Sequence, residues 1–262
     1  MSNQQTVVLL DGGMGQELIK RSANAPTPLW SATVMRDEPD LVTTVHADYI
    51  QADARVITLN NYSATPVRLA KHGLSTAFNE LHQAAITAAQ RAIAQTKPTH
   101  PVAVAGCLPP LVSSYHAEDV PSEAACLADY RALVAAQKDG VNLFLCETLT
   151  TVREVQTAAT AGKESGHPVW VGMTVDDQDG TRLRSGESLA DGVAAAKACG
   201  AAAVLINCSW PEAITQGLPI LAASGLPFGG YANGFTNAAS LAAGSTVAGL
   251  AVRRDLHPDA YA

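Results

Sequence analysis

The stretch Leu143-Phe144-Leu145-Cys146-Glu147 decides the fold class, because it is an apolar run that ends in a carboxylate and has helical sequence on both sides. Short apolar runs bounded by helical patterns are typical of strands that are buried on both faces of a parallel sheet. Runs of this kind recur along the chain. The sequence predicts seven strands, at Val7–Leu10, Arg55–Asn60, Val102–Gly106, Leu143–Glu147, Val169–Thr174, Ala203–Asn207 and Pro227–Tyr231.

Ala-rich helical patterns separate these runs. Several begin at an Asp, Ser or Thr that caps the first turn, and they end near a glycine. The clearest patterns lie at Asp40–Ala52, Thr76–Gln95, Glu123–Asp139, Thr151–Ser165 and Leu189–Ala198. This alternation of strands and helices predicts an α/β protein, which is either a doubly wound open sheet or a (β/α)8 barrel.

The residues at the strand ends favour the barrel. A doubly wound nucleotide-binding sheet needs a glycine-rich phosphate loop, and Gly12-Gly13-Met14-Gly15 lacks the GxGxxG spacing. Polar side chains instead follow nearly every predicted strand, and the C-terminal face of a TIM barrel brings such side chains together. They are Asp11, Asn60, Asn61, Glu147, Thr174, Asn207, Cys208 and Asn233. We expect a single domain of the TIM-barrel type over residues 1–262.

No eighth strand is visible in the sequence after Tyr231. We therefore expect the barrel to be incomplete at its C-terminal side, with the eighth strand absent. A barrel without its last strand leaves two strand edges open, and open edges pair readily with another chain. A homo-oligomer that covers this edge is the assembly that we expect.

Composition excludes several classes of protein. The 262 residues carry a net charge of −7, and the 17 Lys and Arg residues form no cluster, so a nucleic-acid partner is not expected. The sequence has no run of about 18 apolar residues that would predict a membrane span. Val7–Leu10 is too short for a secretory signal. Five cysteines without CxxC spacing indicate free thiols in a cytoplasmic protein.

Three residues at strand ends are candidates for chemistry. Asp11 precedes two glycines and either faces the amino group of a ligand or caps a turn. Glu147 ends a buried strand, where a carboxylate is costly unless it points into a polar site or is paired, whereas strand alternation places Cys146 on the opposite side. Cys208 is a nucleophile, a soft metal ligand or an inert thiol, and one cysteine cannot hold zinc alone.

Several separated motifs resemble the homocysteine S-methyltransferase family in their order and spacing. The resemblance covers essentially the whole chain, and it is strongest toward the branch that uses S-methylmethionine as methyl donor. The matching stretches are 11–18 (DGGMGQEL), 28–32 (PLWSA), 62–66 (YSATP), 146–148 (CET), 206–208 (INC) and 231–234 (YANG).

The resemblance implies a (β/α)8 barrel in which three cysteines hold zinc and the zinc binds homocysteine as a thiolate. That thiolate would take the methyl group of a sulfonium-type donor and become methionine. By position, Cys208 matches the first cysteine ligand, and Asp11 and Glu147 match carboxylates that contact the homocysteine amino group. The expected substrate-binding residues are Asp11, Gly12, Glu147, Thr148 and Asn233.

One part of the family pattern is absent. The second and third zinc ligands of the family are adjacent cysteines in a Gly-Gly-Cys-Cys motif that ends the eighth strand, and this sequence has no such motif. Cys107 lies near the end of a predicted strand, but nothing in the family pattern supports it as a substitute ligand. Loss of two thiolates weakens zinc binding strongly, so we expect methyl transfer by these residues to be impaired.

Two other functions stay open from the sequence. One is a binding protein that keeps the amino-acid pocket of Asp11 and Glu147 but catalyses no transfer. The other is a hydrolase in which Cys208 is the nucleophile and Glu147 is its base. Metal-independent binding of homocysteine or methionine would favour the first of these, and electrophilic labelling of Cys208 would favour the second.

Overall fold

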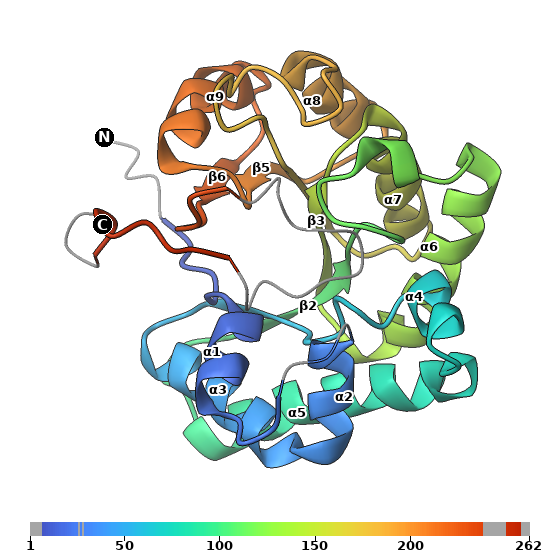
Figure 1. Cartoon of the computed structure of the whole chain (residues 1–262), viewed down its shortest axis with the longest axis vertical. Helices are drawn as coiled ribbons and strands as arrows, with labels where there is room; N and C mark the ends of the chain where they lie inside the picture. Colours follow the sequence, from blue (N-terminus) through green and yellow to red (C-terminus); the bar gives the residue numbers. More distant parts are fainter. Residues whose placement is uncertain (1–6, 26, 28, 238–249, 258–262) are drawn as a thin grey trace.

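A computed structural model describes residues 7–25, 27, 29–237 and 250–257. Within them, six strands form one parallel sheet in which every strand pairs with the next one along the chain, and the sheet curves around a central axis (Figure 1). A strand order without a reversal is that of a barrel and not of a doubly wound sheet. The predicted fold class is confirmed. The strands are β1 (Val56–Thr58), β2 (Ala103–Leu108), β3 (Leu143–Leu149), β4 (Val169–Met173), β5 (Ala203–Asn207) and β6 (Phe228–Tyr231).

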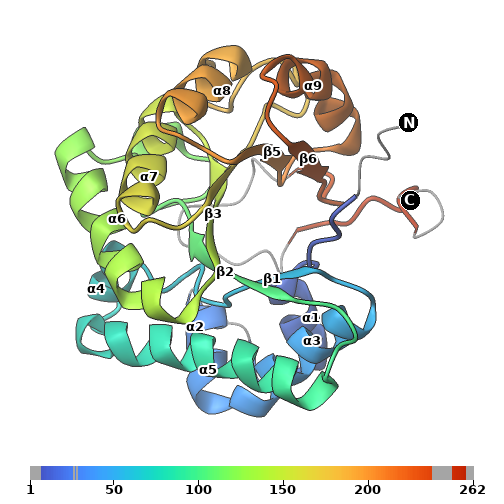
Figure 2. The same cartoon turned by 180° about the vertical axis from the view of Figure 1, so that it is seen from behind.

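The α-helices surround the outer side of the curved sheet (Figures 1 and 2). They are α1 (Met14–Arg21), α2 (Trp30–Asp37), α3 (Pro39–Gln51), α4 (Pro66–Lys71), α5 (Phe78–Thr96), α6 (Glu123–Gln137), α7 (Val152–Glu164), α8 (Leu189–Ala198) and α9 (Pro211–Ala223). Local sequence explains where several of them begin. For example, α7 starts with a capping box, in which Thr151 Oγ1 accepts a hydrogen bond from Glu154 N and the Glu154 carboxylate accepts one from Thr151 N.

The five clearest helical patterns all form helices within about two residues of the predicted ends, which is the usual uncertainty of helix boundaries. The shorter helices α1, α2 and α4 were not among those patterns, and neither was α9. None of the helices in the described part of the chain has the length and apolar character of a membrane span.

Strand alternation separates the core into two parts. Leu143 and Leu145 point inward and join Val56 and Ala105 in a small cluster inside the barrel. Phe144 and Cys146 point outward into the large cluster between the sheet and the helices, which confirms the prediction that Cys146 is a packing residue. The same alternation turns Glu147 inward, two residues beyond Leu145, at the carboxyl end of β3.

The first predicted strand, Val7–Leu10, is only partly formed. Arg55 N donates to Leu9 O and Asp11 N donates to Val56 O, so this segment runs parallel to β1, but only Leu10 makes a β-bridge. The partner strand β1 is three residues long, which leaves little length for a regular ladder. The bridge is nevertheless enough to place Asp11 beside the carboxyl end of β1.

The described residues leave the barrel open between this segment and β6, which do not pair with each other. Val7 is 88% exposed and Phe228 is 44% exposed at the two sides of the opening. The incomplete closure agrees with the expected absence of an eighth strand among these residues.

Candidate functional site

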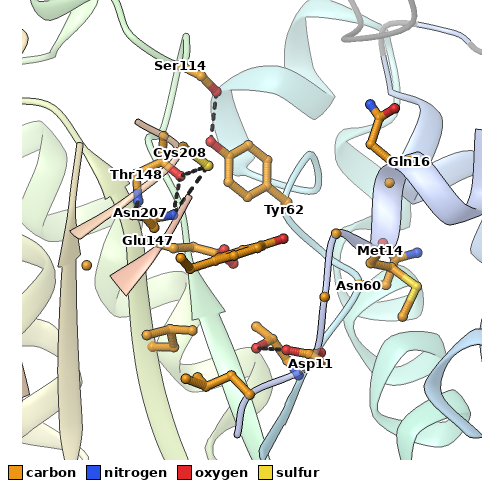
Figure 3. Close-up of a pocket in the computed structure, with 18 of the residues that line it drawn as sticks. Asp11, Met14, Gln16, Asn60, Tyr62, Ser114, Glu147, Thr148, Asn207 and Cys208 are labelled. Atoms are coloured by element: carbon orange, nitrogen blue, oxygen red, sulfur yellow. Dashed lines mark hydrogen bonds between the residues drawn. The ribbon is translucent and has the colours of Figure 1, made fainter. Parts of the chain in front are cut away.

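The carboxyl ends of the strands surround a pocket of about 310 Å³. This is the face of a barrel where side chains from several strands converge. Asp11, Gly12, Glu147, Thr148 and Cys208 all line it, so the structure brings together five of the residues that the sequence singled out. Figure 3 shows Cys208, Thr148 and Asn207 grouped together, with Asp11 across the pocket from them.

Two carboxylates line the pocket, Asp11 and Glu147, and each has a neighbouring hydrogen-bond donor, Thr58 and Cys107 respectively; we call these four residues the carboxylate wall. Asp11 accepts hydrogen bonds from Thr58 N at 2.7 Å and from Thr58 Oγ1 at 3.2 Å. Burial raises the pKa of Asp11 to about 7, and the Thr58 hydrogen bonds oppose that rise. The negative charge of Glu147 contributes to the rise as a smaller effect.

Glu147 is held in a different way. The Cys107 thiol donates to Glu147 Oε1, with a distance of 2.8 Å between Sγ and Oε1. Burial raises the pKa of Glu147, and the hydrogen bond from Cys107 opposes that rise. No described residue donates to Oε2, so one oxygen of this carboxylate is left for a ligand.

A second group is formed by Thr148, Asn207 and Cys208, which we call the sulfur wall; Glu147 lies beside it, and Asp11 lies across the pocket (Figure 3). Asn207 Oδ1 accepts from Thr148 N at 2.8 Å, and Asn207 Nδ2 donates to Thr148 Oγ1 at 2.9 Å. The Cys208 sulfur accepts from Asn207 Nδ2 and from Thr148 Oγ1, each at 3.4 Å. These two donors therefore hold the Cys208 sulfur in position.

The backbone of the sulfur wall is strained. Thr148 has φ of 63° and Cys208 has φ of 53°, both in the left-handed region that residues other than glycine rarely adopt. Gly172 on β4 leaves the space that this arrangement needs, because a Cβ at that position would lie 3.1 Å from Asn207 Oδ1 and 2.9 Å from the Cys146 carbonyl oxygen. Strain of this kind clusters at functional sites.

Arg184 supports the sulfur wall from behind. Its guanidinium forms an ion pair with Asp177 at 3.0 Å, donates to the Cys208 carbonyl oxygen at 3.3 Å and lies 4.8 Å from the centre of the Tyr115 ring. Burial raises the pKa of the Cys208 thiol, with a hydrogen bond from Thr148 opposing the rise. The protein environment that is described therefore favours the neutral thiol.

Of the remaining predicted residues, Gly12 lies at the pocket and Asn233 does not. Gly12 lines the pocket, but the space beside it belongs to Tyr49, whose ring atom Cε1 would lie 2.7 Å from an added Cβ. The absence of a side chain at Gly12 therefore leaves room for the Tyr49 ring, in addition to any role at the pocket. Asn233 is not among the lining residues, and its Oδ1 accepts a hydrogen bond from Phe235 N.

Thr58 and Cys107 were missed as site residues, although a signal for them existed. Strand alternation places Thr58 on the same side as Val56, and Cys107 on the same side as Ala105, which are both interior residues. Arg184 and Tyr115 lie in loops, where no periodic pattern could have predicted their approach to Cys208.

The described residues do not fit a zinc ion. Among them, no group of three or more His, Cys, Asp or Glu side chains is arranged to hold a metal. Cys208 is the one cysteine that lines the pocket, and the Cys107 thiol is engaged by Glu147. Catalytic zinc sites use about three protein ligands, so the donor set found in this part of the chain is too small.

The arrangement also does not form the nucleophile and base of a hydrolase. The Cys208 sulfur accepts hydrogen bonds from Asn207 and Thr148, whereas Glu147 is bonded to Cys107. A cysteine nucleophile needs a base within hydrogen-bonding reach. Within the described residues, Glu147 and Cys208 form no hydrogen bond with each other.

Comparison with known proteins gives a consistent result over the whole chain. The family model for homocysteine S-methyltransferase matches residues 8–261. The homocysteine S-methyltransferase of Escherichia coli (strain K12) is 32% identical over 235 residues, covering 82% of this chain and 74% of that enzyme. The selenocysteine Se-methyltransferase of Brassica oleracea var. italica is 28% identical over 233 residues, covering 79% of this chain and 66% of that enzyme.

Structural comparison agrees with the sequence comparison. The metallated form of the homocysteine methyltransferase MmuM from Escherichia coli matches with a TM-score of 0.73 and 28% identity. The match covers 87% of this chain and 92% of that structure. The chain therefore belongs to the homocysteine S-methyltransferase family.

Proposed function

We propose that this protein binds homocysteine and a sulfonium methyl donor, S-methylmethionine or a similar compound, and transfers the methyl group to the homocysteine sulfur. One observation carries the proposal. Two partly buried carboxylates, Asp11 and Glu147, face the same pocket as the only cysteine among its described lining residues, Cys208. A pocket that presents two carboxylates and a sulfur suits an amino acid that carries a thiol.

In this proposal the carboxylate wall binds the ammonium group of homocysteine, which points its sulfur toward the sulfur wall. Ionised Asp11 and Glu147 provide charge-assisted hydrogen bonds to the ammonium group. Holding both reactants in one pocket favours in-line attack by the homocysteine thiolate on the methyl carbon. The bond from the methyl carbon to the donor sulfur breaks, its electron pair stays on that sulfur, and the thiol proton is released to solvent. With S-methylmethionine, both products are methionine.

We also propose that the transfer by these 262 residues is slow. The resemblance implies a zinc ion held by three cysteines, and the described residues supply Cys208 alone at the pocket. Burial raises the pKa of the Cys208 thiol at this pocket. We propose that a homocysteine thiol bound beside it is likewise disfavoured as a thiolate without a metal ion.

Methionine formation from homocysteine and S-methylmethionine, with zinc supplied, tests the rate. We expect little or no turnover together with measurable binding of homocysteine by calorimetry. Rapid turnover would contradict the proposed impairment but would support the assigned reaction. Absence of homocysteine binding, with and without zinc, would overturn the proposed substrate.

Binding without turnover under every condition would describe a non-catalytic amino-acid-binding relative. One observation favours this second candidate. Asp11 and Glu147 already accept hydrogen bonds from Thr58 and Cys107, so the carboxylates are held in place for binding without a metal ion. Metal-independent affinity for homocysteine or methionine, unchanged by zinc, would distinguish it from the enzyme.

For the assembly, we propose that residues 1–262 form one domain and that a second copy covers its open edge. Val7 and Leu9 on one side of the opening are 88% and 49% exposed, and Phe228 on the other side is 44% exposed. Apolar strand edges of this kind associate with one another. Sedimentation equilibrium should show a dimer, and a monomer at all concentrations would contradict the proposal.

A further inference from the structure

Cys107 is a buried thiol in direct contact with a carboxylate of the pocket, and the proposed transfer assigns it no role. Its side chain is 0% exposed, and its Sγ lies 2.8 Å from Glu147 Oε1. A thiol is a weak hydrogen-bond donor, and a buried cysteine is more commonly a small apolar packing residue. Its position next to a ligand-facing carboxylate therefore needs an explanation.

The backbone around Cys107 is held tightly. Gln137, at the end of α6 and also 0% exposed, accepts from Cys107 N through Oε1 at 2.9 Å and donates through Nε2 to the Cys107 carbonyl oxygen at 3.2 Å. Cys107 is paired in register with Leu145 of β3, which belongs to the interior cluster. Both features direct the Cys107 side chain into the barrel, toward Glu147.

The chemistry of the pair fixes which group donates. Burial raises the pKa of the Cys107 thiol well above its ordinary value, and the negative charge of Glu147 raises it further. The sulfur therefore keeps its one proton, and the Glu147 oxygen is the acceptor. With Oε1 occupied in this way, the carboxylate cannot rotate freely, and Oε2 keeps a fixed direction.

We propose that Cys107 is a positioning residue, which fixes the Glu147 carboxylate so that its second oxygen meets the ammonium group of the amino-acid substrate. This inference rests on the proposed function of Glu147, and it extends that function by adding the residue that orients the carboxylate. Cys107 touches no substrate in this scheme. Its contribution reaches the ligand only through Glu147.

The test compares three variants: Cys107→Ala, Cys107→Ser and, as a matched control, Cys146→Ala. Cys146 is also 0% exposed and lies on the neighbouring strand, but its side chain faces the helices. The probes are L-homocysteine and 4-sulfanylbutanoate, which is the same molecule without its amino group. Dissociation constants are measured by calorimetry under reducing conditions, at an alkaline pH at which both pocket carboxylates are ionised.

We expect Cys107→Ala to weaken homocysteine binding about tenfold, because a hydrogen bond to a charged group is lost. Affinity for 4-sulfanylbutanoate should change less than about twofold, since that probe has no ammonium group for Glu147. Cys107→Ser keeps a donor and should restore homocysteine affinity, and Cys146→Ala should affect both probes equally. An equal loss for both probes in Cys107→Ala, or no rescue by serine, would overturn the inference.

A second measurement needs no ligand and is independent of the proposed function. The S–H stretching band of Cys107, assigned from the infrared difference between wild type and Cys107→Ala, should lie at lower frequency than that of a free thiol. It should move to higher frequency in Glu147→Gln. An unshifted band would overturn the role of Cys107 even if homocysteine binds. If Cys107→Ala does not fold, Cys107→Val takes its place in the comparison with Cys107→Ser. Failure of the wild type to bind homocysteine while the band is shifted would instead defeat the proposed function.

Discussion

The carboxylate wall and the sulfur wall are built by different means. On the carboxylate wall, each acid is supported by a donor from the barrel strands, Thr58 for Asp11 and Cys107 for Glu147. On the sulfur wall, a single thiol is held by Asn207 and Thr148 on a strained backbone. The difference teaches that the described residues supply both carboxylates of the proposed amino-acid site, whereas they supply only one of the three cysteines that the family resemblance implies at the pocket.

The largest expected effect is on the carboxylate wall. Glu147→Gln removes the charge that faces the ammonium group, and we expect homocysteine affinity to fall about 30-fold or more, which corresponds to at least ~2 kcal/mol for a truncated buried charge pair. The free protein should become no less stable, because the amide oxygen still accepts from Cys107 and a partly buried carboxylate, whose pKa is raised by desolvation, is replaced by a neutral group. Calorimetry and thermal unfolding give the two values. An unchanged homocysteine affinity would contradict the role of the carboxylate wall in binding the ammonium group.

The next effect is on the stability of the sulfur wall. Gly172→Ala places a Cβ 3.1 Å from Asn207 Oδ1 and 2.9 Å from a carbonyl oxygen, and overpacking of this kind costs about 1–3 kcal/mol. Chemical denaturation measures this loss. Gly15→Ala is the control, since a Cβ at Gly15 in α1 would meet nothing within 4 Å. A Gly172→Ala protein as stable as the control would contradict the close packing behind Asn207.

A pH dependence should separate Asp11 from the rest of the carboxylate wall. Its pKa is raised to about 7 by burial, so homocysteine affinity should increase as the pH rises through 7 and Asp11 ionises. Stability should change in the opposite direction. Between the ordinary pKa of 3.8 and about 7, the folded state keeps a proton that the unfolded state has released, so stability falls as the pH rises. Asp11→Asn should reduce both slopes. The stability slope that remains belongs to Glu154, whose pKa burial also raises to about 7, and to Glu147, whose pKa burial raises as well. Slopes equal to those of the wild type would contradict the assignment to Asp11.

His46, which lies outside both walls, gives the stability a pH dependence of the opposite sign. This contribution must be removed before the contribution of Asp11 can be measured. His46 in α3 is 0% exposed, neither ring nitrogen has a described partner, and burial lowers its pKa to about 4. Between about 4 and 6.5 the unfolded state binds a proton that the folded state does not, so stability falls as the pH drops. Denaturation of His46→Leu across this range should show a smaller loss on acidification.

The smallest expected effect belongs to the sulfur wall. Cys208→Ser should change homocysteine affinity less than about twofold in the absence of metal, because no charged interaction with the ligand is lost. Calorimetry with a chelator present checks this value. A large loss of homocysteine affinity in Cys208→Ser without metal would mean that the thiol itself recognises the substrate. Substrate recognition would then not belong to the carboxylate wall alone.

Local sequence was sufficient for the barrel and for several of its site residues. The run that ends at Glu147 and the run that ends at Cys208 both carry their polar residue at the carboxyl end of a strand, and parallel strands in a barrel bring those ends together. Alternation also placed Cys146 correctly among the helices. These predictions depend only on strand direction and on the two-residue period.

Tertiary contacts decided the rest. The partnership between Cys107 and Glu147 joins residues 40 positions apart, and its geometry depends on the register between β2 and β3. Arg184 reaches the Cys208 carbonyl oxygen from an irregular segment between β4 and α8. The segment Val7–Leu10 is only partly a strand because its partner β1 is short. The hydrophobic pattern of the sequence does not indicate that length.

The two hydrogen bonds between Gln137 and the Cys107 backbone have a consequence for substitutions on the surface of α6. It joins the inner end of a peripheral helix to the lining of the cavity through two hydrogen bonds and one thiol. A substitution that slides or tilts α6 would therefore alter the aim of the Glu147 carboxylate without touching the cavity. If Glu147 binds the substrate as proposed, we expect substitutions on the solvent-facing side of α6 to change ligand affinity through this chain of contacts.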